Sequence, residues 1–320
     1  MINVKQLSKH FGPKKAVDGI SFTVEKGEVL GFLGPNGAGK STTMRMITGY
    51  IPPTSGTVTV GGHDMWGDSI PAKKLIGYLP ENAPAYTDMT VKGFLKFAAE
   101  IRGLSGADRG KAVDRVVEMC FLENVLHQSV DTLSKGYLHR TCFAQSIIHD
   151  PEILILDEPT DGLDPNQKRE VRNIIRRMGE KKVIVFSTHI LEEVEAVCTR
   201  AIIIDRGKIV ANGSPNELKK QAEASGTVLV RISGAAKDVV SKTLGAVVGA
   251  ATAKIVSSEG QTVEARVLPG GDGENGALAC NIAEAVFKAG WKMEELHTEQ
   301  GRLDDVFRSI TKPDTAKGAA

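Results

Sequence analysis

The feature that most constrains the fold of this chain is the glycine-rich segment "GPNGAGKST" at residues 34–42, which matches G-x-x-x-x-G-K-[ST]. The apolar run "VLGFLG" (29–34) just before it is typical of a buried strand, and a helix is predicted from about Lys40. A strand that leads through a glycine-rich turn into a helix N-terminus directs backbone N–H groups at a bound phosphate. The segment therefore predicts a nucleotide triphosphate site on an α/β sheet.

Each residue type in this segment has a chemical role. The glycines allow the backbone to approach phosphate oxygens closely. Lys40 reaches the β- and γ-phosphates, and the Ser41 hydroxyl is a ligand for Mg²⁺. The candidate nucleotide-binding residues of the segment are Gly34, Pro35, Asn36, Gly37, Ala38, Gly39, Lys40, Ser41 and Thr42.

The segment "ILILDEPTDGLDP" (153–165) supplies carboxylates. Four apolar residues place Asp157 at the C-terminal end of a buried strand, which is where α/β sheets bind ligands. Asp157 is expected to hold Mg²⁺, and Glu158 to orient and deprotonate an attacking water. The alternative is a helix cap or turn, which Pro159 would suit. The need of the phosphate site for a metal-holding carboxylate favours the catalytic interpretation.

Together these motifs resemble the ATPase subunit of an ATP-binding cassette (ABC) transporter over about residues 1–220. In that family a Leu-Ser-Gly-Gly-Gln signature binds the γ-phosphate of ATP held by the other subunit of a head-to-tail dimer. The matching residues here are Leu133, Ser134, Lys135, Gly136 and Tyr137. A helix N-terminus with a small hydroxyl residue and a glycine is consistent with an anion site.

The signature departs from the family pattern at two positions. Lys135 replaces a glycine and Tyr137 replaces the glutamine, whereas Ser134 and Gly136, which approach the phosphate most closely in the family, are retained. Lys135 either adds positive charge near the γ-phosphate or points into solvent, the commoner place for lysine.

The resemblance assigns four more residues. Glu81 stands where the family has the Q-loop glutamine, and its oxygen is also a good Mg²⁺ ligand, although a solvated loop residue is the alternative. His189 resembles the switch histidine that contacts the γ-phosphate and steadies the attacking water. Asp164 belongs to the D-loop and is expected at the dimer interface. Phe11 matches the aromatic residue that stacks on adenine, although a buried strand residue is nearly as consistent with its context.

The predicted fold class is α/β: a P-loop ABC nucleotide-binding domain at 1–220 with a helical subdomain at about 84–150, followed by a small α+β domain at 227–320. Short apolar runs alternate with amphipathic helical patterns up to about residue 220. The polar segment 213–226 is predicted to be a linker. Beyond it the order strand, helix, strand, strand, helix, strand favours a ferredoxin-like module.

Composition restricts the partners. The net charge is +1, from 40 basic and 39 acidic residues, so no overall field would attract nucleic acid, and we expect no nucleic-acid partner. The four cysteines are widely spaced, which is typical of reduced thiols in a cytosolic protein. No signal-peptide pattern and no apolar run near the ~20 residues of a membrane span occur. We therefore expect a cytoplasmic protein bound peripherally to the cytoplasmic face of the membrane.

The resemblance implies ATP and Mg²⁺ as cofactors, a homodimer or heterodimer of ATPase subunits, and separate integral membrane permease subunits. The alternative function is a soluble ABC ATPase that acts on ribosomes or DNA, but such members carry two cassettes or a long inserted coiled coil. The segment "EELHTEQGRLDDVF" (294–307) resembles the accessory domain of some export-type and gliding-motility-type ATPases. The transported substrate, its direction and the role of this tail stay open.

Overall fold

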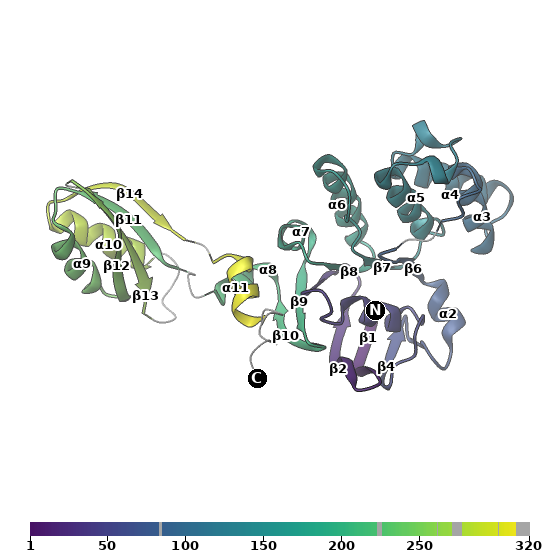
Figure 1. Cartoon of the computed structure of the whole chain (residues 1–320), viewed down its shortest axis with the longest axis horizontal. Coiled ribbons are helices and arrows are strands. Elements are labelled where there is room, and N and C mark those ends of the chain that lie inside the picture. Colours follow the sequence, from purple (N-terminus) through teal and green to yellow (C-terminus); the bar gives the residue numbers. More distant parts are fainter. Residues whose placement is uncertain (83–84, 223–225, 261, 271–276, 300, 312–320) are drawn as a thin grey trace. The chain divides into compact units, whose positions relative to one another are not determined.

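The computed structural model describes residues 1–82, 85–222, 226–260, 262–270, 277–299 and 301–311. The chain forms two compact units, of which the first contains Met1–Pro215 and the second Asn216–Ile310 (Figure 1). Every residue predicted for the nucleotide site belongs to the first unit. Within the described ranges, no helix is both long and apolar enough to cross a membrane.

A six-stranded sheet forms the centre of the first unit, in the order β10-β9-β3-β8-β7-β6. All neighbouring strands are parallel except β10, which runs antiparallel to β9. The strands are β3 (Val29–Leu33), β6 (Ile76–Leu79), β7 (Ile153–Asp157), β8 (Val183–Thr188), β9 (Arg200–Asp205) and β10 (Lys208–Gly213). Strands β3, β7 and β8 are buried along their whole length, because both faces of this sheet are covered.

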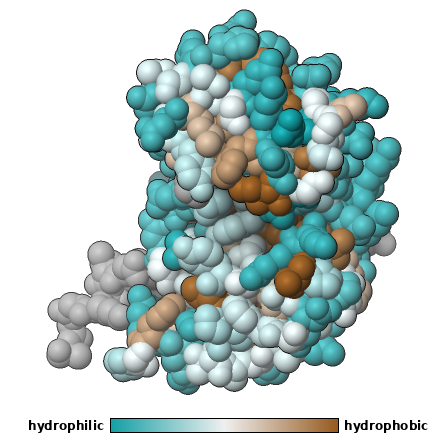
Figure 2. Space-filling view, turned by 90° about the vertical axis from the view of Figure 1, so that its right-hand side faces the viewer, coloured by the Kyte–Doolittle hydropathy of each residue, from teal (hydrophilic) through white to brown (hydrophobic). Residues whose placement is uncertain are grey.

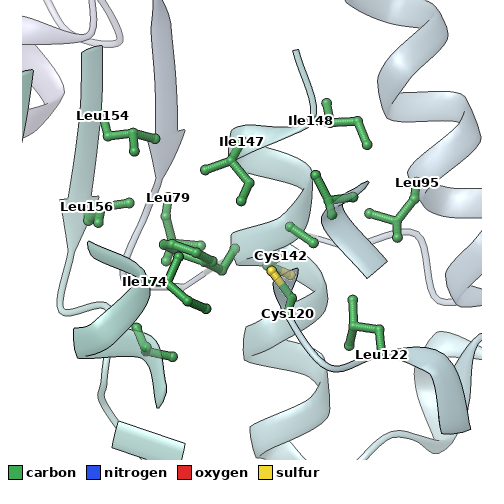
Figure 3. Packing of buried hydrophobic residues seen from close by; sticks show 14 of the residues in the cluster. Leu79, Leu95, Cys120, Leu122, Cys142, Ile147, Ile148, Leu154, Leu156 and Ile174 are labelled. Carbon is green, nitrogen blue, oxygen red and sulfur yellow. The ribbon is translucent and has the colours of Figure 1, made fainter. Parts of the chain in front are cut away.

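Alternate residues of the central strands serve two different cores. Leu154 and Leu156 point to a cluster with the helices, while Ile153 and Ile155 join a cluster with the N-terminal strands. Figure 3 shows Leu79, Leu154 and Leu156 facing the helical side chains across the first of these cores. The helices of this side are α3 (Val91–Ile101), α4 (Gly106–Met119), α5 (Lys135–Ile147), α6 (Pro165–Gly179) and α7 (Leu191–Val197), with short 3₁₀ turns at Glu123–Val125 and Val130–Thr132.

An antiparallel sheet in the order β2-β1-β4-β5 covers the other face of the central sheet (Figure 1). Its strands are β1 (Ile2–Phe11), β2 (Lys14–Val24), β4 (Ser55–Val60) and β5 (His63–Asp64), and the helices α1 (Lys40–Ile47) and α2 (Ser69–Lys74) belong to the same side. This antiparallel sheet was not predicted from the sequence. Seen from the side that carries α2 and α3, the surface is mostly hydrophilic, with hydrophobic residues in scattered patches (Figure 2).

The second unit is a four-stranded antiparallel sheet in the order β12-β13-β11-β14, the strand order of a ferredoxin-like module. Its elements are β11 (Val228–Ser233), α9 (Lys237–Gly245), β12 (Ala250–Glu259), β13 (Thr262–Pro269), α10 (Ala277–Lys288), β14 (Lys292–Thr298) and a closing helix α11 (Leu303–Ile310). The segment predicted as a linker contains helix α8 (Pro215–Lys220). Pro215 fits a first helical position, and Leu218 is fully buried.

Candidate nucleotide site

The glycine-rich segment lies where the sequence predicted it, between the end of β3 and the start of α1. Gly39 precedes the helix with φ of +112°, and a Cβ atom there would lie 2.5 Å from the Ala16 carbonyl oxygen. Only glycine satisfies both the backbone conformation and the close contact. The loop is therefore held tightly against β2 at the point where the α1 amides become available to a ligand.

Lys40 is a buried cation in this loop. Its side chain is 7% exposed, and its Nζ donates to the carbonyl oxygens of Gly34, at 2.7 Å, and Pro35, at 3.3 Å. The same Nζ lies 3.9 Å from Oε1 of Glu158. Burial lowers the pKa of Lys40, and the negative charges of Glu158, Asp157 and Glu81 oppose that shift. The site thus places a poorly solvated cation beside a carboxylate.

Asp157 ends β7 and is 1% exposed. Its Oδ1 accepts hydrogen bonds from Ser41 Oγ, at 3.1 Å, and from Ser187 Oγ at the end of β8. Its Oδ2 is buried and has no hydrogen-bond partner among the described residues. A buried carboxylate oxygen without a donor fits a bound cation, and Ser41 beside it adds a hydroxyl ligand. These residues therefore fit the Mg²⁺ that the motif implies.

Glu158 follows in a left-handed backbone conformation, with φ of +53°. Its N–H donates to the carbonyl oxygen of Ser187, at 3.2 Å, and to Ser187 Oγ, at 3.1 Å. Its Oε2 lies 3.0 Å from Nδ1 of His189. Burial raises the pKa of the Glu158 carboxyl, and the hydrogen bond from His189 and the Lys40 charge oppose the rise. The structure thus brings the candidate base and the candidate switch histidine into direct contact.

A cavity of about 330 Å³ is lined by Lys40, Ser41 and Glu158, whereas Asp157 and His189 are not among its lining residues in the described part of the chain. Phe11 is 51% exposed at its rim, which is inconsistent with the buried strand residue considered as the alternative. Lys9 Nζ lies 5.2 Å from the centre of the Phe11 ring. The lining residues are Phe11, Lys14, Ala16, Asn36, Gly37, Gly39, Lys40, Ser41, Thr42, Glu81 and Glu158. Glu81 therefore lines the same cavity as the phosphate loop. Gly34, Pro35 and Ala38 are not among the described lining residues. Their carbonyl oxygens instead accept hydrogen bonds within the loop and from the Gly207 N–H.

Comparisons with known proteins agree with this geometry. A sequence model of the family described as "ABC transporter" matches residues 17–161. The probable multidrug ABC transporter ATP-binding protein YbhF of Escherichia coli (strain K12) is 40% identical over 223 residues, which cover 69% of this chain and 38% of that protein. The linearmycin resistance ATP-binding protein LnrL of Bacillus subtilis (strain 168) is 35% identical over 235 residues, which cover 73% of this chain and 76% of that protein. This chain belongs to the ABC transporter family.

The fold prediction for the ABC cassette is confirmed by a solved structure described as the ATP binding subunit of an ABC transporter. It matches with a TM-score of 0.64 and 28% identity, and the match covers 69% of this chain and 92% of that one. The chain spans 38% of the length of the Escherichia coli relative and about three quarters of the Bacillus subtilis relative.

The segment predicted to be the signature contains the start of helix α5. Ser134 is the N-cap residue, and its Oγ accepts the N–H of Tyr137 at 3.3 Å. The Tyr137 ring lies under the Arg140 guanidinium, 4.4 Å from ring centre to Cζ. Within the described part of the chain, the signature residues do not line the cavity of the phosphate loop. Their assignment to ATP of a second subunit stays a prediction.

Lys135 contacts the turn after Glu158 in the same chain. Its Nζ donates to Asp161 Oδ2 at 3.1 Å. A Cβ atom on Gly162, whose φ is +68°, would lie 2.2 Å from that Nζ, so the lysine lies directly over the glycine. Next to it, a Cβ on Gly136 would lie 2.3 Å from Oε1 of Gln167. The start of α5 therefore contacts the predicted D-loop through Lys135 and helix α6 through Gly136, and neither contact was predicted from the sequence.

The predicted D-loop residue Asp164 caps helix α6. Its Oδ1 accepts the N–H of Gln167 at 2.9 Å, and Pro165 occupies the first helical turn. The place of Asp164 at a dimer interface stays a prediction.

Three candidate functional residues were not predicted from the sequence: Ser187, Thr188 and Glu193. The only signal for the first two is their position directly before His189.

Proposed function

We propose that this chain is the ATP-binding and ATP-hydrolysing subunit of an ABC transporter. The observation that carries the proposal is a single cavity lined by the phosphate loop, Phe11, Glu81 and Glu158, with His189 in contact with Glu158. In this proposal the adenine stacks on Phe11 and the triphosphate lies along the loop amides and Lys40. Lys40 Nζ, which donates to the carbonyl oxygens of Gly34 and Pro35, would contact the β- and γ-phosphates.

Mg²⁺ would be held by Ser41, Glu81 and Asp157, in part through water. When bound, the cation neutralises charge on the β- and γ-phosphates. The described residues contain no group of three or more His, Cys, Asp and Glu side chains arranged to hold a metal ion. The remaining ligands would therefore come from the nucleotide and from water, as is common for Mg²⁺. The hydrogen bond from Ser187 keeps Asp157 Oδ2 as the atom available for this contact.

Hydrolysis follows from the positions of Glu158 and His189. Glu158 would accept a proton from the attacking water while that water adds to the γ-phosphorus and ADP leaves. The pKa of Glu158 is raised by burial, which makes this carboxylate a better proton acceptor than an exposed one. His189 would fix the carboxylate through Nδ1 and steady the γ-phosphate and water.

The proposed active unit is a dimer, a homodimer or a heterodimer, in which the signature of one subunit faces the ATP of the other. The separation of the signature from the phosphate-loop cavity within one chain supports this arrangement. Separate membrane-spanning permease subunits would convert the closing and opening of the dimer into transport, with the ATPase on the cytoplasmic face. The multidrug and linearmycin resistance names of two relatives favour export.

One experiment tests this proposal at two levels. The tagged chain is purified from detergent-solubilised native membranes, its partners are identified, and phosphate release from Mg-ATP is measured. Recovery of a polytopic membrane protein in stoichiometric amount, together with ATP hydrolysis, is the expected result. Recovery only with ribosomes or DNA-bound proteins would replace the transporter by the soluble ATPase. Absence of both ATP binding and hydrolysis would reject the nucleotide site itself.

A further inference from the structure

A buried carboxyl group, that of Glu193, is hydrogen-bonded to residues close in sequence to Glu158 and His189. Glu193, on α7, is 2% exposed. Its Oε1 accepts a hydrogen bond from Thr160 Oγ1, and its Oε2 accepts one from Thr188 Oγ1 at 2.9 Å. No ion pair to Glu193 is formed among the described residues, so the two hydroxyls are its observed polar contacts. Burial of a carboxyl group without hydrogen-bond partners costs free energy, so these two hydrogen bonds stabilise Glu193 at this position.

The two threonines belong to the two turns that carry the catalytic candidates. Thr160 lies two positions after Glu158, and Thr188 directly precedes His189. Thr188 Oγ1 also accepts the N–H of Ile190 at 3.0 Å, so it fixes the backbone on both sides of the histidine. Glu193 therefore joins the turn of the proposed base to the turn of the proposed switch residue through two hydrogen bonds.

The backbone of Glu158 explains why such a link is needed. A non-glycine residue with φ of +53° is held in a conformation that costs free energy, and it persists only where its surroundings fix it. Ser187 accepts a hydrogen bond from the Glu158 N–H through its Oγ, which stabilises this backbone conformation. The Thr160 hydroxyl bound to Glu193 fixes the turn two residues later.

We infer that Glu193 is a positioning residue for ATP hydrolysis, which holds the Glu158 turn and the His189 turn together through Thr160 and Thr188. This inference rests on the proposed function. Glu193 touches neither nucleotide nor water in this role. It keeps His189 Nδ1 at hydrogen-bond distance from Glu158 Oε2, and so keeps the carboxylate aimed at the attacking water.

The test compares variants of the two threonines that remove the hydroxyl with variants that keep it. Val matches Thr in shape but cannot donate to Glu193, whereas Ser keeps the donor. We expect Thr160→Val and Thr188→Val each to lower kcat by about 10- to 100-fold, the scale for small misplacements of a catalytic group, with ATP affinity unchanged within about twofold. Thr160→Ser and Thr188→Ser should keep kcat close to that of the parent, and Glu192→Gln, an exposed neighbour on α7, is the matched control.

A background variant separates positioning from general loosening. In Glu158→Gln, Thr188→Val should cause no further loss of turnover, because the group that it positions is already gone. Retention of full turnover by both valine variants would overturn the inference. So would equal losses of turnover and ATP affinity, or additive losses in the Glu158→Gln background.

Amide hydrogen exchange tests the link without relying on turnover. Glu193→Gln should speed exchange at the Ile190 amide, which Thr188 accepts, and unchanged exchange there would also overturn the inference. If Glu158→Gln turns over ATP at the rate of the parent, Glu158 is not the base, and the part of the proposed function on which this inference rests fails. If that variant is inactive but the valine variants are active, only the role of Glu193 fails.

Discussion

His189 Nδ1 lies 3.0 Å from Oε2 of Glu158, across two turns that are 31 residues apart in the sequence. The Glu158 side chain is 12% exposed and that of His189 is 53% exposed, so the pair joins the interior of the site to its surface. An ionised carboxylate only accepts hydrogen bonds, so Nδ1 of His189 is the donor in this contact. The contact thereby sets the orientation of both side chains before any nucleotide is considered.

Glu158→Gln removes the proposed base while it preserves the shape of the side chain. We expect ATP binding to persist and hydrolysis to fall by on the order of a hundredfold or more, the scale for loss of a general base. Phosphate release and equilibrium ATP binding measure the two quantities separately. Glu152→Gln, at an exposed position just before β7, is the control. Normal turnover in Glu158→Gln would exclude this residue as the base.

The sequence predicted the parts of the site that lie in contiguous motifs. The phosphate loop, Asp157 and Glu158 could be assigned because each follows an apolar strand within a few residues. The link from Glu193 to Thr160 could not, because hydroxyl and carboxylate residues far apart in the chain carry no periodic pattern. Its partners were identified only when the fold brought the three segments together.

Lys135 allows its two alternative roles to be separated. Its ion pair with Asp161 is exposed, with side-chain exposures of 69% and 56%, so the pair contributes about 0–1 kcal/mol. If the pair is its only role, Lys135→Ala and Asp161→Ala should each change turnover by less than about fivefold. The double variant should be no worse than either single variant, and high salt should reduce the differences.

The contrary outcome for Lys135 is equally specific. A loss of more than about tenfold in Lys135→Ala, with Asp161→Ala close to the parent, would mean that the lysine acts on the γ-phosphate. Steady-state phosphate release as a function of ATP concentration distinguishes the two cases.

Phe11 is the candidate adenine platform, and its exposed ring at the cavity rim supports that role. Stacking of a base on an aromatic ring contributes about 1–3 kcal/mol, as measured by alanine substitution. We expect Phe11→Ala to weaken ATP binding by about 5- to 150-fold, and Phe11→Tyr to leave it nearly unchanged. Inorganic triphosphate lacks the base, so its binding should be equal in all three proteins. Equal ATP affinity in Phe11→Ala and the parent would reject the stacking role.

The fold was predictable where strands are buried on both faces and only in part elsewhere. Strand β7 was evident from its continuous apolar residues. Strands β1 and β2 have mixed burial patterns with irregular register, so no clean alternation marked the antiparallel sheet in the sequence. Helix α8 was not predicted, because it lies in a polar segment and has a single buried side chain, Leu218. One apolar residue in so short a helix gives no periodic pattern.

His149 provides a prediction about stability. Its Nε2 lies 3.1 Å from the Ile76 carbonyl oxygen, and its Nδ1 is buried without a hydrogen-bond partner among the described residues. Burial, followed by the nearby charge of Arg102, lowers the pKa of His149 to about 4 from its ordinary 6.5. Between these values the unfolded chain binds a proton that the folded chain does not, so the stability from this residue is lost as pH falls from about 6.5 towards 4.

His149→Gln removes the titrating group and leaves an amide that can still donate to Ile76. Between pH 7 and 4.5 we expect the free energy of unfolding of the variant to fall by about 1–2 kcal/mol less than that of the parent. This difference is smaller than the full pKa shift of His149 would give, because the ring is only partly buried. The melting temperatures of the two proteins, measured at both pH values, give this difference. His127→Gln, at an exposed histidine, should behave like the parent. Equal losses in His149→Gln and the parent would show that His149 does not cause the acid sensitivity.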